Sequence, residues 1–487
     1  MVACISPLRC RAIEPPAASG ETAAILLRGE PRAPAARTPE TTLSLYQPLD
    51  VAGEIRATVR LALPLVLTQL AGIGANVLEI MLAGHLGPQV MGAVAVGTNV
   101  WHFALMGLIG VMMSLSPTVA QLDGAGSRGE AAGQFRQALW LGFGVGVIAL
   151  VLLQTLGPLL IAAIGLDPAL AAEATTFLRA TCCGAPALAP YVACRGLTEG
   201  LSMPRPSLII GLLGLVVLAP MGWTSMYVLH LGALGLGISL AVTLWAQFFA
   251  FFAFIHLSPR YRDLDWTSGR RGPDWPAIWS LFRLGGPMAV SVMMESGMFS
   301  ATALLIGRFG AVAVSGHQIA LSVASVTFMV PLGLAIATTV RVGNAAGAGD
   351  MPAARRSAAI GLGLALLSQA GAAALMLTLP RAIAGLYTED PAVVAFAAGL
   401  LFLAALFQLS DGGQVTAAAA LRGLKDARLP MYITIIAYWG IGMPIGCWLT
   451  FGLAWGAPGM WVGLIAALTA AAVLLWFRFL RLSRASM

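Results

Sequence analysis

Three acidic side chains lie deep inside long apolar segments of this sequence: Glu79, Glu295 and Asp411. None has a nearby Lys or Arg in its own segment, so no local ion-pair partner is available. A carboxylate at the centre of a bilayer costs about 3 kcal/mol or more, and such residues are usually functional. Burial favours the neutral form of a carboxyl group and a bound cation favours the charged form, so each acid is suited to exchanging a proton for a cation.

The residues around these acids fit a binding cavity. Methionine adapts to varied ligands and aromatic faces hold cations, and both types lie near Glu295 and Asp411. We therefore expect a site for a coupling cation or a cationic substrate. The expected ligands are Glu295, Asp411 and Glu79, facing one shared chamber, and the expected lining residues are Met294, Met298, Phe407, Gln414 and Gln318.

The composition is that of an integral membrane protein. Of the 487 residues, 58% are hydrophobic and 10% are charged, and the mean hydropathy is +0.85. A soluble protein carries about 25% charged residues. The apolar runs are continuous rather than alternating, which predicts helices and not a β-barrel. The basic residues lie between the runs, so the net charge of +7 does not indicate a nucleic-acid surface.

Twelve segments are long enough to cross a bilayer, which takes about 20 helical residues. The expected spans are 60–82, 92–120, 137–164, 172–194, 207–229, 232–256, 283–306, 313–340, 356–380, 393–420, 430–452 and 458–480. The longest connection follows the sixth span. We expect an all-α membrane protein with a disordered cytoplasmic tail (1–52), a six-helix lobe (53–257), a cytoplasmic linker (258–282) and a second six-helix lobe (283–487).

Basic residues are distributed unequally between the connections. Connections after even-numbered spans hold most of them, including Arg195 and Arg422, whereas those after odd-numbered spans hold only Arg308 and Arg381. Cytoplasmic loops carry the excess of Lys and Arg. We therefore expect both termini and the linker in the cytoplasm, and the chain in the inner (plasma) membrane.

Turn-forming residues keep the same spacing in the two halves of the chain. The shift along the sequence from Pro64 to Pro287, here called the repeat spacing, also pairs Gly84 with Gly307, Gly87 with Gly310, Gly124 with Gly347, Gly126 with Gly349 and Pro168 with Pro391. The triplets 195–197 and 422–424 match at a slightly larger shift, and we interpret them as helix ends separated by a small insertion. The pattern predicts duplicated lobes, related by a pseudo-two-fold axis along the membrane normal, with a cavity between them.

Other kinds of chemistry are not indicated. The cysteines form no C-x-x-C pattern, and no G-x-x-x-x-G-K-S/T loop for ATP is present. Asp263-Leu264-Asp265 is similar to a metal-binding motif of glycosyl transfer, but no catalytic domain surrounds it. We expect no enzymatic activity and no cofactor other than the coupling ion.

Three motifs together resemble those of the multidrug and toxic compound extrusion (MATE) transporters, in particular the NorM-type branch. They lie at Gly316-His317-Gln318-Ile319-Ala320, at 342–349 and at 408–426, and the resemblance extends from about residue 55 to residue 480. It implies two six-helix lobes facing each other in a V, and export of organic cations and hydrophobic drugs in exchange for Na⁺ or H⁺. Under this resemblance, Na⁺ at Glu295 and Asp411 is the only candidate metal.

The resemblance also implies roles for single residues. Glu295 falls at the coupling glutamate of the seventh span, and Asp411 at the aspartate of the tenth. Glu79 stands where the branch usually has an aspartate, so the charge is kept on a longer side chain. Phe407 stands where a tyrosine is common, which removes one hydroxyl ligand and weakens the argument for Na⁺.

The sequence thus predicts a monomeric, cation-coupled multidrug antiporter whose partners are the bilayer and small cationic or amphipathic drugs. The alternative is an exporter of a specific metabolite, or a flippase for a lipid-linked precursor, on a related scaffold. A flippase for a pyrophosphate lipid would line its cavity with several Arg or Lys side chains, and we expect none inside the spans. A major-facilitator carrier would show a basic loop after its second span, which 121–126 lacks.

Overall fold

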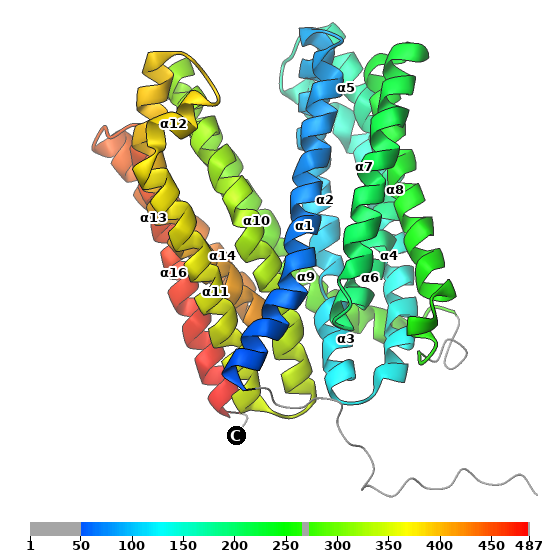
Figure 1. The fold of residues 1–487 in the computed structure, drawn as a ribbon. Coiled ribbons are helices and arrows are strands. Elements are labelled where there is room, and N and C mark those ends of the chain that lie inside the picture. Colours follow the sequence, from blue (N-terminus) through cyan, green and yellow to red (C-terminus); the bar gives the residue numbers. More distant parts are fainter. Residues whose placement is uncertain (1–49, 265–271, 486–487) are drawn as a thin grey trace, which may run out of the picture. The chain divides into compact units, whose positions relative to one another are not determined.

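The structure is a computed structural model that describes residues 50–264 and 272–485. Within these ranges every regular element is a helix, and no strand occurs (Figure 1). The predicted tail lies outside the described residues up to residue 49, and so does Asp265 of the Asp-x-Asp motif. The all-α fold class predicted from the sequence is confirmed.

The helices follow one another in two groups, coloured blue to green and green to red in Figure 1. The N-terminal bundle comprises α1 (Val51–Gly84), α2 (Pro88–Met112), α3 (Leu115–Gly124), α4 (Ala131–Ala163), α5 (Pro168–Thr181), α6 (Ala185–Gly200), α7 (Arg205–Trp223) and α8 (Gly232–Leu257). The C-terminal bundle comprises α9 (Trp275–Ile306), α10 (Ala311–Gly347), α11 (Met351–Thr378), α12 (Pro380–Gly385), α13 (Pro391–Gly423), α14 (Arg428–Ile435), α15 (Met443–Cys447) and α16 (Ala457–Ala485).

Eleven helical segments of the described chain are long and apolar enough to cross a membrane. The predicted span 172–194 is not among them because it is split into α5 and α6 by a 3₁₀ turn at Cys182–Gly184. Pro186 and Pro190 follow this turn, and proline has no N–H to continue the helical hydrogen bonds. With this broken helix the structure carries the expected twelve spans.

Helix α9 begins at Trp275, whereas the sequence analysis placed the start of the seventh span at residue 283. Pro276 lies in the first turn, a position that requires no backbone N–H. Trp275 and Trp279 are exposed, as expected of aromatic side chains at a membrane–water boundary. The first two turns of α9 were missed because Trp, Pro and Arg lower the local hydropathy.

Helices α1 and α9 share an internal proline followed four residues later by a hydroxyl. The Thr68 hydroxyl donates to the carbonyl of Pro64 at 2.8 Å, and the Ser291 hydroxyl donates to that of Pro287 at 3.0 Å. Proline lacks the N–H that would bond the carbonyl four residues earlier, and in the turn that follows the hydroxyl bonds the carbonyl of the proline itself. The two helices are therefore equivalent members of the repeat.

The repeat also extends to backbone angles. Gly87 and Gly310 have φ of 110° and 89°, and Ser202 and Lys425 have φ of 59° and 57°. Helices α6 and α13 end at Gly200 and Gly423, which again differ by the repeat spacing. The interpretation of the triplet 195–197 as a helix end is therefore wrong. It lies one turn before the end of α6, and no insertion is needed to match the two helices.

The two bundles meet through repeat-related contacts, in which α1 packs on α10, α2 on α9, and α3 on α10. A Cβ atom at Gly124 would overlap the carbonyl of Asn344, and one at Gly347 would overlap the carbonyl of Gln121. Gly124 and Gly347 are one repeat pair, and Gln121 and Asn344 are another. Only glycine permits backbones to approach this closely.

Candidate functional site

Glu295 and Asp411 lie in the C-terminal bundle, on α9 and α13. Asp411 is 4% exposed, and Glu295 is half-buried. The two carboxyl groups are close enough for their charges to repel. In the described part of the chain neither forms an ion pair within 4.0 Å. The structure therefore brings together the two acids that the sequence analysis selected in this half.

Arg422 also interacts electrostatically with Glu295, although the described chain shows no ion pair between them. The sequence analysis counted Arg422 among the loop residues. In the structure it lies in the last turn of α13, the helix that carries Asp411. One cationic group is thus closer to the acids than the spacing along the sequence suggested.

Tyr438 lies beside both acids. It is 1% exposed and belongs to a π-helical turn at Ile436–Gly442. Its hydroxyl interacts with Glu295 and Asp411, but within the described residues it makes no hydrogen bond of ordinary length. π-helical turns inside α-helices are rare and frequently occur at functional sites.

Further buried polar atoms around this cluster have no hydrogen-bond partner in the described structure: Oε1 of Gln414, Nε1 of Trp461 and both ring nitrogens of His317. The His317 and Trp461 rings lie edge to face, with centroids 5.8 Å apart. Most buried polar groups in proteins are paired, so several orphans in one place indicate a site that binds an ion, water or ligand.

Helix α13 is held in place by amide contacts next to Asp411. Gln408 accepts a hydrogen bond from Nε2 of Gln369 at 2.6 Å and donates to the Thr327 hydroxyl. These side chains belong to α13, α11 and α10. These hydrogen bonds hold α13 against α10 and α11 one turn from Asp411.

The predicted lining residues have different surroundings. Phe407 is buried and packs edge to face on Trp461 at 5.7 Å, and Met298 is buried against Gly442. Met294 is half-buried, and its carbonyl accepts a hydrogen bond from Trp439. Gln318 is exposed, in contrast to its neighbour His317. The structure thus places Phe407 and Met298 in the packed wall of the cluster and leaves Gln318 outside it.

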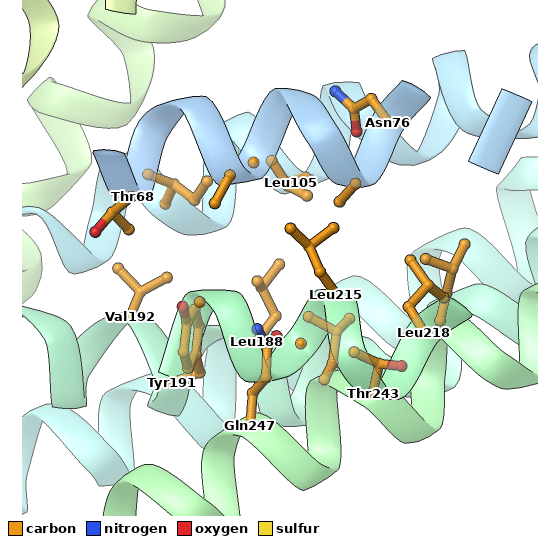
Figure 2. A pocket seen from close by; sticks show the side chains of 18 of the residues that line it. Thr68, Asn76, Leu105, Leu188, Tyr191, Val192, Leu215, Leu218, Thr243 and Gln247 are labelled. Carbon is orange, nitrogen blue, oxygen red and sulfur yellow. The ribbon is translucent and has the colours of Figure 1, made fainter. Parts of the chain in front are cut away.

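Glu79 lines a separate cavity of about 310 Å³ in the N-terminal bundle. Its side chain is 9% exposed and forms no ion pair within the described residues. Figure 2 shows this cavity between α1, which carries Thr68 and Asn76, and the helices that carry Tyr191 and Gln247. All of its lining residues belong to α1, α2, α6, α7 and α8.

A guanidinium group lines the same cavity. Arg195 lies inside α6, and not in a loop as the sequence analysis placed it. Its Nε donates to Glu199 at 3.2 Å and its Nη2 donates to Gln69 at 3.2 Å. Gln69 precedes Glu79 by ten residues on α1, which is about 15 Å along the helix. The cavity therefore has an acid toward one end and a paired arginine toward the other.

The expectation that all three acids face one shared chamber is not met. The cavity at Glu79 is formed by the N-terminal bundle alone, whereas Glu295 and Asp411 belong to the other bundle. The depth of an acid in a span can be estimated from the sequence. The face on which it lies depends on how the helices rotate against one another, and the hydrophobic pattern of a nearly uniform apolar span does not determine that.

The two sites occupy equivalent positions in the repeat. At the repeat spacing, the counterparts of Glu295, Asp411 and Tyr438 are Gly72, Leu188 and Leu215, and all three counterparts line the N-terminal cavity. The counterpart of Gln414 is Tyr191, which lines it too. The C-terminal cluster and the N-terminal cavity thus lie at equivalent places in the duplicated fold, and their polar groups differ.

The sequence analysis missed several residues of these sites, notably Tyr438, Trp461, Arg195 and Gln69. Gln69 and Gln247 are uncharged polar residues in mid-span, a signal that was available but was not weighed. Arg195 followed the expected distribution of loop arginines. Tyr438 and Trp461 look like ordinary interfacial aromatics in sequence, and only the tertiary fold places them beside the acids.

A model of the MatE family matches residues 64–224 of this chain and matches again at 287–448. A probable multidrug resistance protein NorM of Xanthomonas campestris is 44% identical over 437 residues, covering 89% of this chain and 95% of the relative. A NorM relative of Xylella fastidiosa is 39% identical, covering 88% and 92%. The multidrug resistance protein MdtK of Yersinia enterocolitica is 37% identical, covering 87% and 95%.

Solved structures share the fold at low sequence identity. The crystal structure of the eukaryotic MATE transporter AtDTX14 is 20% identical, with a TM-score of 0.82 over 90% of this chain and 98% of that one. A multidrug resistance MATE transporter in an outward-facing conformation is 18% identical, with a TM-score of 0.81 over 91% and 99%.

Proposed function

Because this chain belongs to the MatE family of multidrug and toxic compound extrusion transporters, we propose that it is a cation-coupled multidrug antiporter of the inner membrane. It exports organic cations and hydrophobic drugs by alternating access, as a monomer with both termini in the cytoplasm. Its relatives are transporters, and no enzymatic step is assigned to it.

The observation that carries this proposal is the pair of acids Glu295 and Asp411, neither of which forms an ion pair with a basic residue in the described structure. Two neighbouring carboxyl groups repel when both are charged, and a proton or a monovalent cation relieves that repulsion. The Tyr438 hydroxyl and Gln414 Oε1 are oxygen atoms without hydrogen-bond partners in the described structure, of the kind that Na⁺ prefers. The pair is therefore suited to binding Na⁺ or H⁺.

Antiport requires that the ion and the drug favour opposite states of the transporter. A ligand shifts a conformational equilibrium only by its difference in affinity for the two states. A cationic drug and the coupling ion compete for the same negative charge, so binding of one displaces the other. In this proposal Glu295 and Asp411 are the competed groups, and loading by the ion drives release of the drug.

Glu79 gives the N-terminal bundle a second acidic site in this scheme. Its cavity is mostly apolar, and its polar lining residues include Thr243, Gln247 and Tyr191. Drug sites are mainly apolar pockets with a few polar anchors, within a range of about 300–1,000 Å³. The N-terminal cavity is thus assigned to the apolar part of a drug, with Glu79 as its charged anchor.

Arginines do lie within helices, as a flippase for a lipid-linked precursor would require. Among the described residues, Arg195 and His102 are the basic side chains that line the N-terminal cavity, and Arg195 is already paired with Glu199. A pyrophosphate lipid carries several negative charges and requires several free cations. In this cavity, one paired guanidinium favours organic cations over such a lipid.

The proposal is tested by Glu295→Gln in a drug-sensitive bacterial host at matched expression. We expect loss of resistance to cationic dyes and drugs, because the substitution removes the charge and keeps the size of the side chain. The control is Glu389→Gln, the same substitution at an exposed acid before α13, which should retain resistance. Equal resistance in the parent and in Glu295→Gln would contradict the coupling role.

A further inference from the structure

A larger cavity, of about 610 Å³, lies at the end of the molecule where α1 begins. It is separate from both acidic sites, and five arginines line it: Arg56 and Arg60 of α1, Arg205 at the start of α7, Arg260 just after α8 and Arg341 of α10. Within the described ranges, no Asp or Glu lines it. In the sequence, Arg205, Arg260 and Arg341 only indicated membrane orientation.

The positive charge of this arginine cavity is largely uncompensated. Arg341 is paired with Glu54, which is 1% exposed and also accepts a hydrogen bond from Ser357 at 2.7 Å. The other four arginines are exposed and form no ion pair within 4.0 Å in the described structure. Asp50, at the start of α1, is engaged in capping the N–H of Gly53 at 2.9 Å.

Converging guanidinium groups have a definite chemical preference. Arginine presents planar pairs of N–H donors that match the oxygen atoms of a phosphate, and such hydrogen bonds are strengthened by charge. The cavity volume is within the range of ligand sites, about 300–1,000 Å³. We propose that this arginine cavity binds a phosphate-bearing anion, a function separate from transport of drugs through the two acidic sites.

The surroundings favour a phospholipid headgroup as the source of that phosphate. Val59 and Leu63 on α1 and Ile209 on α7 are exposed apolar residues a short distance along the helices that carry the arginines. Helices α1 and α7 pack against each other. Acyl chains can therefore lie on these side chains while the headgroup occupies the cavity, as at other basic pockets at the cytoplasmic ends of membrane helices.

A bound anion would also link the two bundles. Arg341 belongs to the C-terminal bundle and the other lining arginines to the N-terminal bundle and the segment that follows it. A ligand that neutralises both sets stabilises the arrangement in which they face one cavity, and it is released when the bundles separate there. The site thus makes the conformational equilibrium sensitive to anionic lipid.

The test uses the full chain purified in detergent, and it measures thermal unfolding against added phosphatidylglycerol, phosphatidylcholine with the same chains, or inorganic pyrophosphate. The site variant is Arg60→Gln with Arg205→Gln. The control is Arg428→Gln, because this exposed arginine is the repeat counterpart of Arg205 and begins α14 as Arg205 begins α7, but does not line the cavity. Native mass spectrometry counts retained lipid as an independent readout.

We expect phosphatidylglycerol to raise the unfolding midpoint of the parent and of Arg428→Gln, with an apparent affinity weakened about tenfold or more in the site variant. If pyrophosphate raises the unfolding midpoint in the same saturable way and the site variant loses this response, the arginine cavity is confirmed as an anion site and its ligand is a soluble phosphate. Equal responses to both lipids with none to pyrophosphate, or an unchanged response and unchanged lipid retention in the site variant, would overturn the proposal.

Discussion

Several side chains in the C-terminal cluster carry buried polar atoms that form no hydrogen bond of ordinary length in the described structure. Asp411, Tyr438 and Gln414 are buried, and the described structure gives Tyr438 Oη and Gln414 Oε1 no hydrogen-bond partner. A buried polar atom without a partner costs about 1–3 kcal/mol. Several such atoms in one cluster are expected where a bound ion or substrate supplies the missing interactions. This is the residue-level basis for assigning ion binding here.

Tyr438→Phe tests this interpretation. The hydroxyl makes no hydrogen bond of ordinary length in the described structure, so its removal should not lower the thermal unfolding midpoint. The apparent affinity of the coupling ion should fall about threefold to tenfold, because one hydrogen bond contributes about 0.5–1.5 kcal/mol. The measurement is displacement of bound tetraphenylphosphonium by Na⁺ and by protons. A loss of stability with unchanged ion affinity would assign Tyr438 to packing instead.

Arg195 and Glu199 form the main ion pair of the N-terminal cavity, and both are mostly buried. Arg195→Gln leaves the Glu199 carboxylate without its partner, which should destabilise the protein by about 3–5 kcal/mol. Adding Glu199→Gln should restore most of the thermal unfolding midpoint. A double variant as unstable as Arg195→Gln would show that the guanidinium acts through some other contact.

At the level of helices, duplication explains most of the architecture. Paired prolines in α1 and α9, paired positive φ angles and paired glycines at the contact between bundles all recur at the repeat spacing. The π-helical turn at Ile436–Gly442 is an exception, since the corresponding part of α7 is regular α-helix. One element that differs between the halves is thus the one that carries Tyr438.

The glycines between the bundles give a prediction for α3 and α10. Gly124→Ala places a Cβ on the backbone carbonyl of Asn344, which cannot move away as a side-chain end could. We expect a loss of about 1–3 kcal/mol, and a similar loss for Gly347→Ala because its contact is equivalent. Differential unfolding measurements would test this.

The matched control for these substitutions is Gly371→Ala. Gly371 lies inside α11, and no atom is within 4 Å of a Cβ at that position. Alanine is a better helix former than glycine by about 1 kcal/mol, so this variant should be as stable as the parent or more so. If Gly124→Ala and Gly371→Ala behave alike, the close approach of the bundles is not a determinant of stability.

At the level of the whole molecule, apolar length and repeat spacing are sufficient to predict an all-α fold with twelve spans. The pattern predicts the fourth span as one helix, although Pro186 and the turn at Cys182–Gly184 divide it. The pairing of Glu295 with Asp411 can be anticipated because both acids lie at similar depth in one half. The position of a residue within an apolar segment determines its depth in the membrane, so this depth can be predicted from sequence.

The rotation of each helix about its own axis cannot be predicted from sequence in the same way. The sequence predicts a chamber shared by Glu79 and the other acids, and the structure places Glu79 in a cavity of its own bundle. The distribution of basic residues predicts Arg195 in a loop, although α6 continues to Gly200. In spans that are apolar on all sides, which face lies inward is decided by packing against distant helices, and a single sequence does not contain that packing explicitly.

The central claim is that the Glu295–Asp411 pair couples an ion gradient to drug movement. The most direct measurement is dye uptake into inverted membrane vesicles driven by a Na⁺ gradient alone or a pH gradient alone, comparing the parent with Asp411→Asn. The account predicts that one of the gradients accelerates uptake by the parent, and that neither gradient accelerates uptake by Asp411→Asn. Equal, gradient-driven uptake by both proteins would contradict it.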